Sequence, residues 1–175
     1  MAIKTNMGSV SRALDFYNKD EIFFCIGKTS PWPDEENPPE PDADSTIEGA
    51  IGYKRHEFKY LVVPYDGGDT PDGTVIIDYG PDSKWKAVPA GSAVDEKAMW
   101  VYVETTINAE DFPLGDYRQV GLYTNLVRAS GVDSNKTTLL PSEVEDPGLL
   151  EIIDNRVKVT RLEDTRENLS FIIKF

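Results

Sequence analysis

The residues best suited to nucleophilic or acid–base chemistry in this sequence are its single histidine, His56, and its single cysteine, Cys25. His56 stands in the polar run Lys54-Arg55-His56-Glu57 at the entrance to an expected strand, a setting typical of a surface histidine rather than of a general base. A cysteine nucleophile needs a polar, partly exposed thiol, whereas Cys25 lies inside the most apolar segment of the chain. The two residues therefore do not predict a thiol-dependent enzyme.

Two groups of carboxylates could support other chemistry. In the loop Asp66–Gly73 the aspartates stand at relative positions 1, 4 and 7, whereas an EF-hand needs 1, 3 and 5 and a glutamate at 12, where this chain has Ile77. A looser calcium site made of oxygen ligands stays open there, although aspartates gather in turns for backbone reasons far more often. Glu35 and Glu36 lie in an open, proline-rich segment, where nothing would desolvate a carboxyl group and raise its pKa as acid catalysis requires.

Nucleotide-binding glycine motifs and Cys-x-x-Cys pairs are absent from the sequence. We therefore expect a protein that is not an enzyme, with no catalytic residues, no cofactor and no metal site.

Composition narrows the class of protein further. The 175 residues suit a single domain, and with 31 acidic against 18 basic residues the formal net charge is −13. A charge of this sign repels phosphate backbones and anionic membrane surfaces, so neither nucleic acid nor a membrane is an expected partner. One cysteine excludes an internal disulfide, and no window has the 18 or more apolar residues of a membrane span. We expect a soluble protein that folds by packing alone.

The N-terminal third predicts one helix and one buried strand. Ser9–Lys19 carries apolar residues at helical spacing, with Ser9 or Ser11 as the expected N-cap. The run Ile22–Ile26 is continuously apolar, which indicates that Glu21–Gly27 forms a strand buried on both faces.

The rest of the chain predicts mainly strands. Phe58–Tyr65 and Thr74–Tyr79 flank the Asp66–Gly73 loop and indicate a hairpin. The remaining expected strands are Ala98–Ile107, Tyr117–Arg128, Arg156–Leu162 and Asn168–Phe175. The predicted fold class is mainly β, a sandwich-like two-layer architecture with a short N-terminal helix and long loops, with an α+β fold as the alternative.

Two long loops interrupt this pattern within the expected single domain 1–175: a proline-rich acidic loop at 28–45 and a polar surface loop at 129–148, the latter with a short element near Leu139. Pro31–Asp44 holds five prolines and six acidic residues, so it can neither continue a helix nor pair regularly as a strand. Because prolines restrict the unfolded chain, an extended arm of this kind loses less entropy on docking.

Within this loop Trp32 could anchor a partner, or it could pack against the protein's own core. The candidate interface residues are Trp32, Pro33, Asp34, Glu35, Glu36, Asn37, Pro38 and Pro39.

Ordered blocks of residues resemble a known family. At the start these are Phe16-Tyr17-Asn18, an aromatic strand, Gly27-Lys28-Thr29-Ser30-Pro31-Trp32 and Glu36-Asn37-Pro38-Pro39. Near the end they are Tyr117-Arg118-Gln119, Thr124-Asn125, Glu151 through Asn155-Arg156, Glu167-Asn168 and Phe175. In this order they resemble the small baseplate wedge protein of T4-type contractile-tailed bacteriophages, the gene-eight product family. The middle, about Ile47 to Asp116, aligns loosely, so the chain would be a shortened member.

The resemblance implies a structural subunit of the tail baseplate that is assembled in the host cytoplasm and incorporated into the virion. It implies contacts with other baseplate wedge proteins, a homodimer as one form, and no catalytic residues. The alternative is a β-sandwich carbohydrate-binding module, because Trp32, Trp85 and Trp100 could stack on sugar rings.

Overall fold

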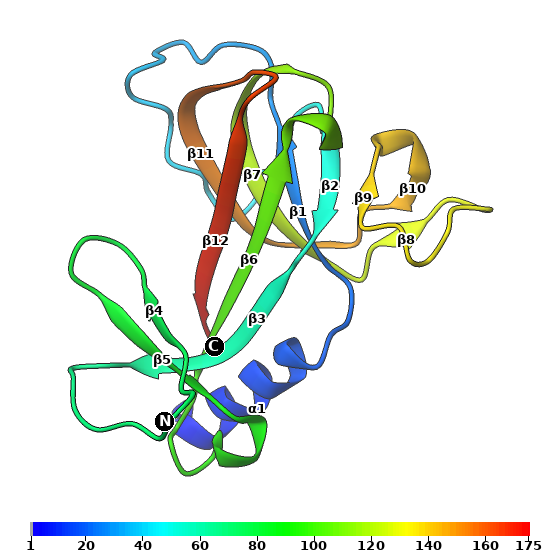
Figure 1. Ribbon diagram of the computed structural model, residues 1–175. Coiled ribbons are helices and arrows are strands. Elements are labelled where there is room, and N and C mark those ends of the chain that lie inside the picture. Colours follow the sequence, from blue (N-terminus) through cyan, green and yellow to red (C-terminus); the bar gives the residue numbers. More distant parts are fainter. Residues whose placement is uncertain (1) are drawn as a thin grey trace. The chain divides into compact units, whose positions relative to one another are not determined.

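The computed structural model describes residues 2–175 and is mainly β, with antiparallel sheets and one short α-helix, as the sequence predicts (Figure 1). In the described part of the chain we find no helix with the length and apolar character needed to cross a bilayer. The elements in chain order are α1 (Asn6–Tyr17), β1 (Ile22–Gly27), β2 (Gly52–Arg55), β3 (Phe58–Pro64), β4 (Ile76–Asp78), β5 (Lys84–Val88), η1 (Ala90–Ser92), β6 (Trp100–Asn108), η2 (Ala109–Asp111), β7 (Gly115–Thr124), β8 (Val127–Arg128), β9 (Thr138–Leu139), η3 (Pro141–Glu143), β10 (Val144–Asp146), β11 (Leu149–Arg161) and β12 (Arg166–Lys174).

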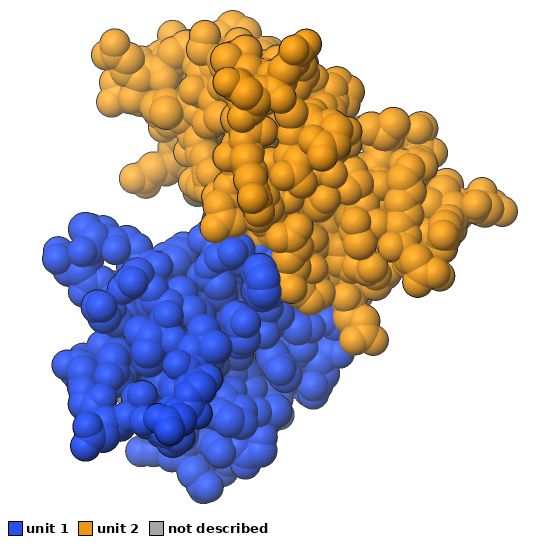
Figure 2. Space-filling view, viewed as in Figure 1, with its two compact units in different colours: residues 1–19, 58–104, 170–175 blue, residues 20–57, 105–169 orange. Residues whose placement is uncertain are grey.

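The chain divides into two compact units, which Figure 2 shows in blue and orange. Unit 1 comprises residues 1–19, 58–104 and 170–175, and unit 2 comprises residues 20–57 and 105–169. Two of the four boundaries fall inside strands, after Glu104 in β6 and after Leu169 in β12, and the other two follow Lys19 and Glu57.

Unit 2 contains an antiparallel sheet with the strand order β11-β7-β1-β2-β9 and a two-stranded ribbon of β8 and β10. β1 lies at the centre of the sheet, and all six of its residues are buried, which confirms the prediction made from its unbroken apolar run. One face of the sheet packs a core that partly buried side chains such as Ile47 and Leu150 extend. The buried residues of this core are Phe23, Cys25, Tyr53, Tyr123, Leu126 and Leu139.

Unit 1 packs α1 against β3. Val10, Ala13 and Phe16 form the buried stripe of the helix, and the ring of Phe16 meets that of Phe175 with 5.1 Å between centroids. The predicted N-cap was wrong, because the helix begins earlier. Thr5 caps it by accepting a hydrogen bond from the backbone N–H of Gly8 at 3.2 Å.

The predicted hairpin of β3 with β4 was also wrong. β5 pairs with β3 on one side and with β4 on the other, in a sheet with the order β12-β6-β3-β5-β4. The hairpin turn lies at residues 79–83, where Gly80 adopts a φ of +76°, and it joins β4 to β5. β5 escaped prediction because its sequence Lys84-Trp85-Lys86-Ala87-Val88 alternates charged and apolar residues over only five positions.

The other predicted strands are present with altered boundaries. Tyr117–Arg128 divides into β7 and β8 at Asn125, a non-glycine residue with a φ of +61°. β11 begins at Leu149 rather than at Arg156, and it pairs with β7 along its length. The expected short element near Leu139 is β9, which pairs with β2.

Candidate protein interface

The long connection between β1 and β2 contains the acidic loop, by which we mean Pro31–Asp44. Residues 28–51, all of them described, form neither helix nor strand. Figure 1 shows this segment in light blue beside β11, within unit 2. Side-chain contacts, rather than sheet pairing, therefore position the loop.

Trp32 packs the start of the acidic loop against the rest of unit 2. Its side chain is only 8% exposed, its indole Nε1 donates to the backbone carbonyl of Arg156 at 2.9 Å, and the Nζ of Lys28 lies 4.4 Å from its ring centroid. The indole is thus engaged within its own unit. The neighbouring residues Pro33 and Asp34 are exposed.

A β-bulge in β11 creates the acceptor that Trp32 uses. Asn155 faces Gln119 of β7 and Val159 faces Tyr117, so the three residues 156–158 stand opposite Arg118 alone. Extra residues in a bulge leave the regular ladder, and their carbonyls need other partners. The indole of Trp32 supplies that partner for Arg156.

Arg118 of β7 holds the acidic loop in place at Glu35. Its side chain is 4% exposed, and its Nε and Nη2 donate to the carboxylate of Glu35 at 2.7–2.9 Å. Its Nη1 donates to the carbonyl of Thr29 at 2.6 Å. A two-pronged guanidinium–carboxylate pair fixes orientation as well as distance.

The pKa of Glu35 lies below its ordinary value, chiefly because Arg118 donates hydrogen bonds to the carboxylate. An acid catalyst needs the opposite shift.

Gln119 and Asn155 hold the far side of the loop. The Oε1 of Gln119 accepts from the backbone N–H of Glu48 at 2.8 Å, and its Nε2 donates to the Oδ1 of Asn155 at 2.9 Å. The Nδ2 of Asn155 then donates to the carbonyl of Pro39 at 2.8 Å, and the Nζ of Lys28 pairs with Glu48 at 2.6 Å. We call these contacts of Lys28, Trp32, Glu35, Arg118, Gln119, Asn155 and the Arg156 carbonyl the clamp.

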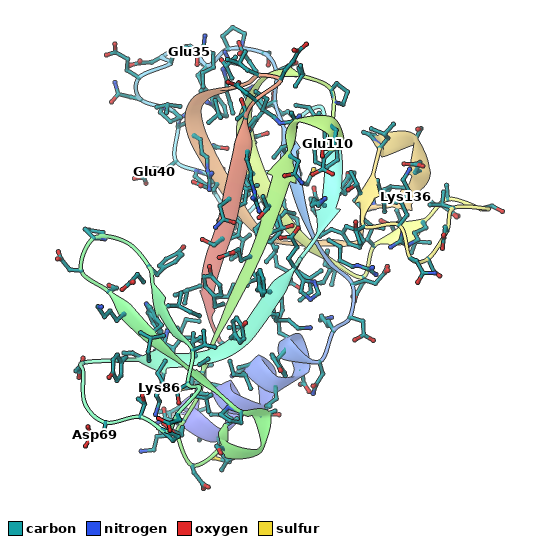
Figure 3. The ribbon with its side chains drawn as sticks, in the orientation of Figure 1. Glu35, Glu40, Asp69, Lys86, Glu110 and Lys136 are labelled. Carbon is teal, nitrogen blue, oxygen red and sulfur yellow. The ribbon has the colours of Figure 1, made fainter. Side chains whose placement is uncertain are left out.

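The clamp engages Glu35 and leaves the other acidic side chains of the loop exposed. Asp34 and Asp42 accept local hydrogen bonds that stabilise turns, as in the 3.0 Å contact from the N–H of Glu36 to Asp34. Glu36, Glu40 and Asp44 are exposed, and within residues 2–175 none of the three forms an ion pair. Figure 3 shows Glu40 pointing away from the strands. The loop therefore presents unneutralised carboxylates on a fixed backbone.

The acidity of the protein is concentrated in the unit that carries this loop. Unit 2 has 22 acidic and 10 basic residues, a net charge of −12, whereas unit 1 has 9 acidic and 8 basic residues, a net charge of −1. A surface of this charge attracts basic partners and repels acidic ones.

Lowering the pH should weaken the clamp at Glu35. Because the folded-state pKa of Glu35 is depressed, the stability that its pairing contributes is present above the unfolded-state pKa and is lost as the pH falls through the folded-state value. We expect the indole N–H resonance of Trp32 to shift and to exchange faster with water as the pH falls through the depressed pKa of Glu35. Glu35→Gln should show the altered resonance already at pH 7, and an identical titration of the two proteins would contradict this role.

The other residues considered for chemistry are engaged elsewhere. Cys25 is fully buried, and burial raises the pKa of its thiol well above the ordinary value, so it stays protonated. The Nδ1 of His56 lies 3.2 Å from the carbonyl of Ile22. Within residues 2–175, no group of three or more His, Cys, Asp or Glu side chains could hold a metal ion, the Asp66–Gly73 loop included.

The three tryptophans offer little to a sugar ring. Trp32 is buried in unit 2, while Trp85 and Trp100 of unit 1 meet edge to face with 5.7 Å between ring centroids. The Nζ of Lys174 lies 5.3 Å from the ring centroid of Trp100. The carbohydrate-binding alternative gains no support from these packed rings.

Of the eight candidate interface residues, the structure brings Trp32 and Glu35 into the clamp and leaves Pro33, Asp34, Glu36, Asn37 and Pro39 exposed and Pro38 half-buried. Sequence reasoning did not single out Arg118 as a residue of the site. Its signal was an arginine within a predicted strand that is rich in apolar residues, because an arginine buried in a sheet requires a partner.

Comparison with known proteins covers the whole chain. The family described as "Baseplate wedge 3 tail fiber network component" matches residues 1–175. "Virion protein 3" of Enterococcus phage phiEF24C is 38% identical over 178 residues, which cover 99% of this chain and 94% of that protein. Blocks that carried the resemblance in the sequence, among them Lys28–Trp32, Arg118-Gln119 and Asn155-Arg156, meet in the clamp.

Proposed function

Because this chain belongs to the baseplate wedge 3 tail fiber network component family, whose members are structural proteins of the phage virion, we propose that it is a wedge subunit of a contractile-tail baseplate. It acts by fitting against neighbouring baseplate proteins and carries out no reaction. The family match over residues 1–175 is the observation that carries this proposal. Assembly takes place in the host cytoplasm before the tail is complete.

The acidic loop is the surface that we propose for one of these contacts. The clamp holds its backbone through Arg118 and Asn155, so docking requires little further ordering of the chain. Its outward carboxylates at Glu36, Glu40 and Asp44 suit a neighbour that presents lysine or arginine.

A second copy of this chain is a poor partner for the loop. Unit 2 carries a net charge of −12, so two such units would repel each other at close range. If the protein forms a homodimer, we expect surfaces other than the acidic loop to make the contact.

Virion composition tests the proposed function directly. Tails and complete particles are purified by density gradient and analysed by quantitative mass spectrometry, with immunogold labelling of intact particles. We expect the protein in both preparations, in a fixed ratio to other baseplate proteins, and gold at the tip of the tail. Absence from purified tails, or label on the capsid alone, would contradict the proposal.

The structure also changes how the loop should be tested. A deletion of Asp34–Asp42 would disturb folding as well as docking. That deletion removes Glu35 and Pro39, which Arg118 and Asn155 contact, and it leaves a buried guanidinium without its carboxylate. Substitution of the outward carboxylates keeps the clamp contacts and therefore separates docking from folding.

A further inference from the structure

Unit 1 contains a groove of about 490 Å³ that the family assignment does not explain. It lies among the end of α1, strands β3 and β5, the Pro71–Val75 segment and the Pro89–Glu96 segment. In Figure 3 the labelled residues Lys86, on β5, and Asp69, on the adjoining loop, mark this part of unit 1.

The lining is largely apolar and aromatic. Tyr60 of β3 contributes a half-buried ring, Val88 of β5 is buried, and Val75 lines the groove with 41% of its surface exposed. Tyr17 and Pro89 complete this part of the lining. Binding of apolar side chains to such a surface is favourable in free energy, because it removes apolar area on both sides from water.

The cations near the groove are already engaged. Lys86 donates to both carboxylate oxygens of Glu96, at 2.8 and 3.0 Å. Lys59 places its Nζ 5.4 Å from the ring centroid of Tyr17 and donates to the carbonyl of Lys19. Neither lysine therefore neutralises the acidic side of the groove.

That acidic side is the loop between β3 and β4. Asp72 lines the groove, Asp66 and Asp69 lie in the same loop, and within residues 2–175 none of the three forms an ion pair. The loop is ordered around Asp72, since the N–H and hydroxyl of Thr74 both donate to the carbonyl of Pro71, at 3.1 and 2.7 Å. The groove thus combines an apolar floor with the carboxylate of Asp72 at its edge.

We propose that this groove docks an extended segment of a neighbouring protein in which an apolar residue stands beside arginine or lysine. The apolar side chain would cover Tyr60, Val75 and Val88, and the cation would pair with Asp72. The acidic loop of a second copy is a poor occupant, because it holds six acidic residues and no basic one that could pair with Asp72. The groove is a second contact surface, independent of the acidic loop.

Peptide binding to the full-length protein tests this proposal without any phage component. The probe is a fluorescein-labelled nonapeptide, Pro-Leu-Arg repeated three times, followed by fluorescence anisotropy. We expect saturable binding with a Kd of about 10–100 μM, about tenfold weaker binding after Val75→Lys and about threefold weaker binding after Asp72→Asn.

Two controls separate the groove from general attraction to an acidic protein. Ile3→Lys introduces the same charge at an apolar residue of unit 1 that is 81% exposed and belongs to none of the segments that line the groove, and it should change Kd by less than about twofold. The peptide Pro-Ser-Arg repeated three times keeps the charge and should bind about tenfold more weakly. Equal effects of Val75→Lys and Ile3→Lys, equal binding of both peptides, or no binding at 1 mM would each overturn the proposal.

Discussion

Replacing Arg118 with leucine should lower the free energy of unfolding by about 2 kcal/mol and release the acidic loop from unit 2. The substitution removes the hydrogen bonds to Glu35 and Thr29 while keeping an apolar side chain of moderate size in β7. We expect a lower urea midpoint and much faster hydrogen exchange of the loop backbone, both measured on the purified protein.

Arg156→Leu is the matched control. Among residues 2–175 the side chain of Arg156 forms an ion pair only with the partly exposed carboxylate of Asp154, at 2.6 Å, and its contact with Trp32 is made by the backbone carbonyl. Exposed pairs contribute little, so this variant should stay within about 0.5 kcal/mol of wild type and keep the loop protected. If both arginine variants lost the same stability, the clamp would have no special role.

Reversing the outward charges of the loop should strongly reduce incorporation of the protein into tails while sparing the fold. Glu36→Lys, Glu40→Lys and Asp44→Lys together change the charge of the loop by six units and touch none of the clamp residues. We expect at least a tenfold loss of incorporation into tails, because like charges at a docking surface are strongly unfavourable. The urea midpoint should change little, since all three side chains are exposed and unpaired.

The same charge change elsewhere in unit 2 provides the control. Glu145, Glu163 and Asp164 are exposed residues of unit 2 outside the acidic loop. Their triple lysine variant should enter tails at a level near that of wild type. Equal loss in the two triple variants would show that overall charge, rather than the loop, governs incorporation.

Sequence reasoning located strands best where the hydrophobic pattern was strong. β1 could be predicted because a central strand buried on both faces needs an unbroken apolar run. The strands β5 and β2 could not be predicted, because each is short and mixes charged with apolar residues. They form strands only by pairing with β3 and β1 in the tertiary structure. The choice of strand partner failed for a related reason. Turn residues occur both at 66–73 and at 79–83, and local sequence does not decide which turn closes a hairpin.

In the candidate interface, too, local sequence features could be predicted and long-range contacts could not. The prolines and carboxylates of Pro31–Asp44 predicted a loop, because such residues exclude regular pairing. The clamp could not be predicted from the sequence, because its contacts join residues that are more than 80 positions apart. Trp32 contacts Arg156, and Glu35 contacts Arg118. The bulge that frees the Arg156 carbonyl is a property of the register between β7 and β11.

Zero-length carbodiimide cross-linking of purified tails, followed by mass spectrometry, tests the central claim most directly. The reagent joins a carboxylate to a lysine amine in contact with it, and the acidic loop holds six carboxylates and no lysine. We expect Glu36, Glu40 or Asp44 to be linked to lysines of another baseplate protein. Links from other carboxylates of this chain to neighbouring proteins, with the loop peptides recovered unmodified, would contradict the assignment of the loop as a docking surface.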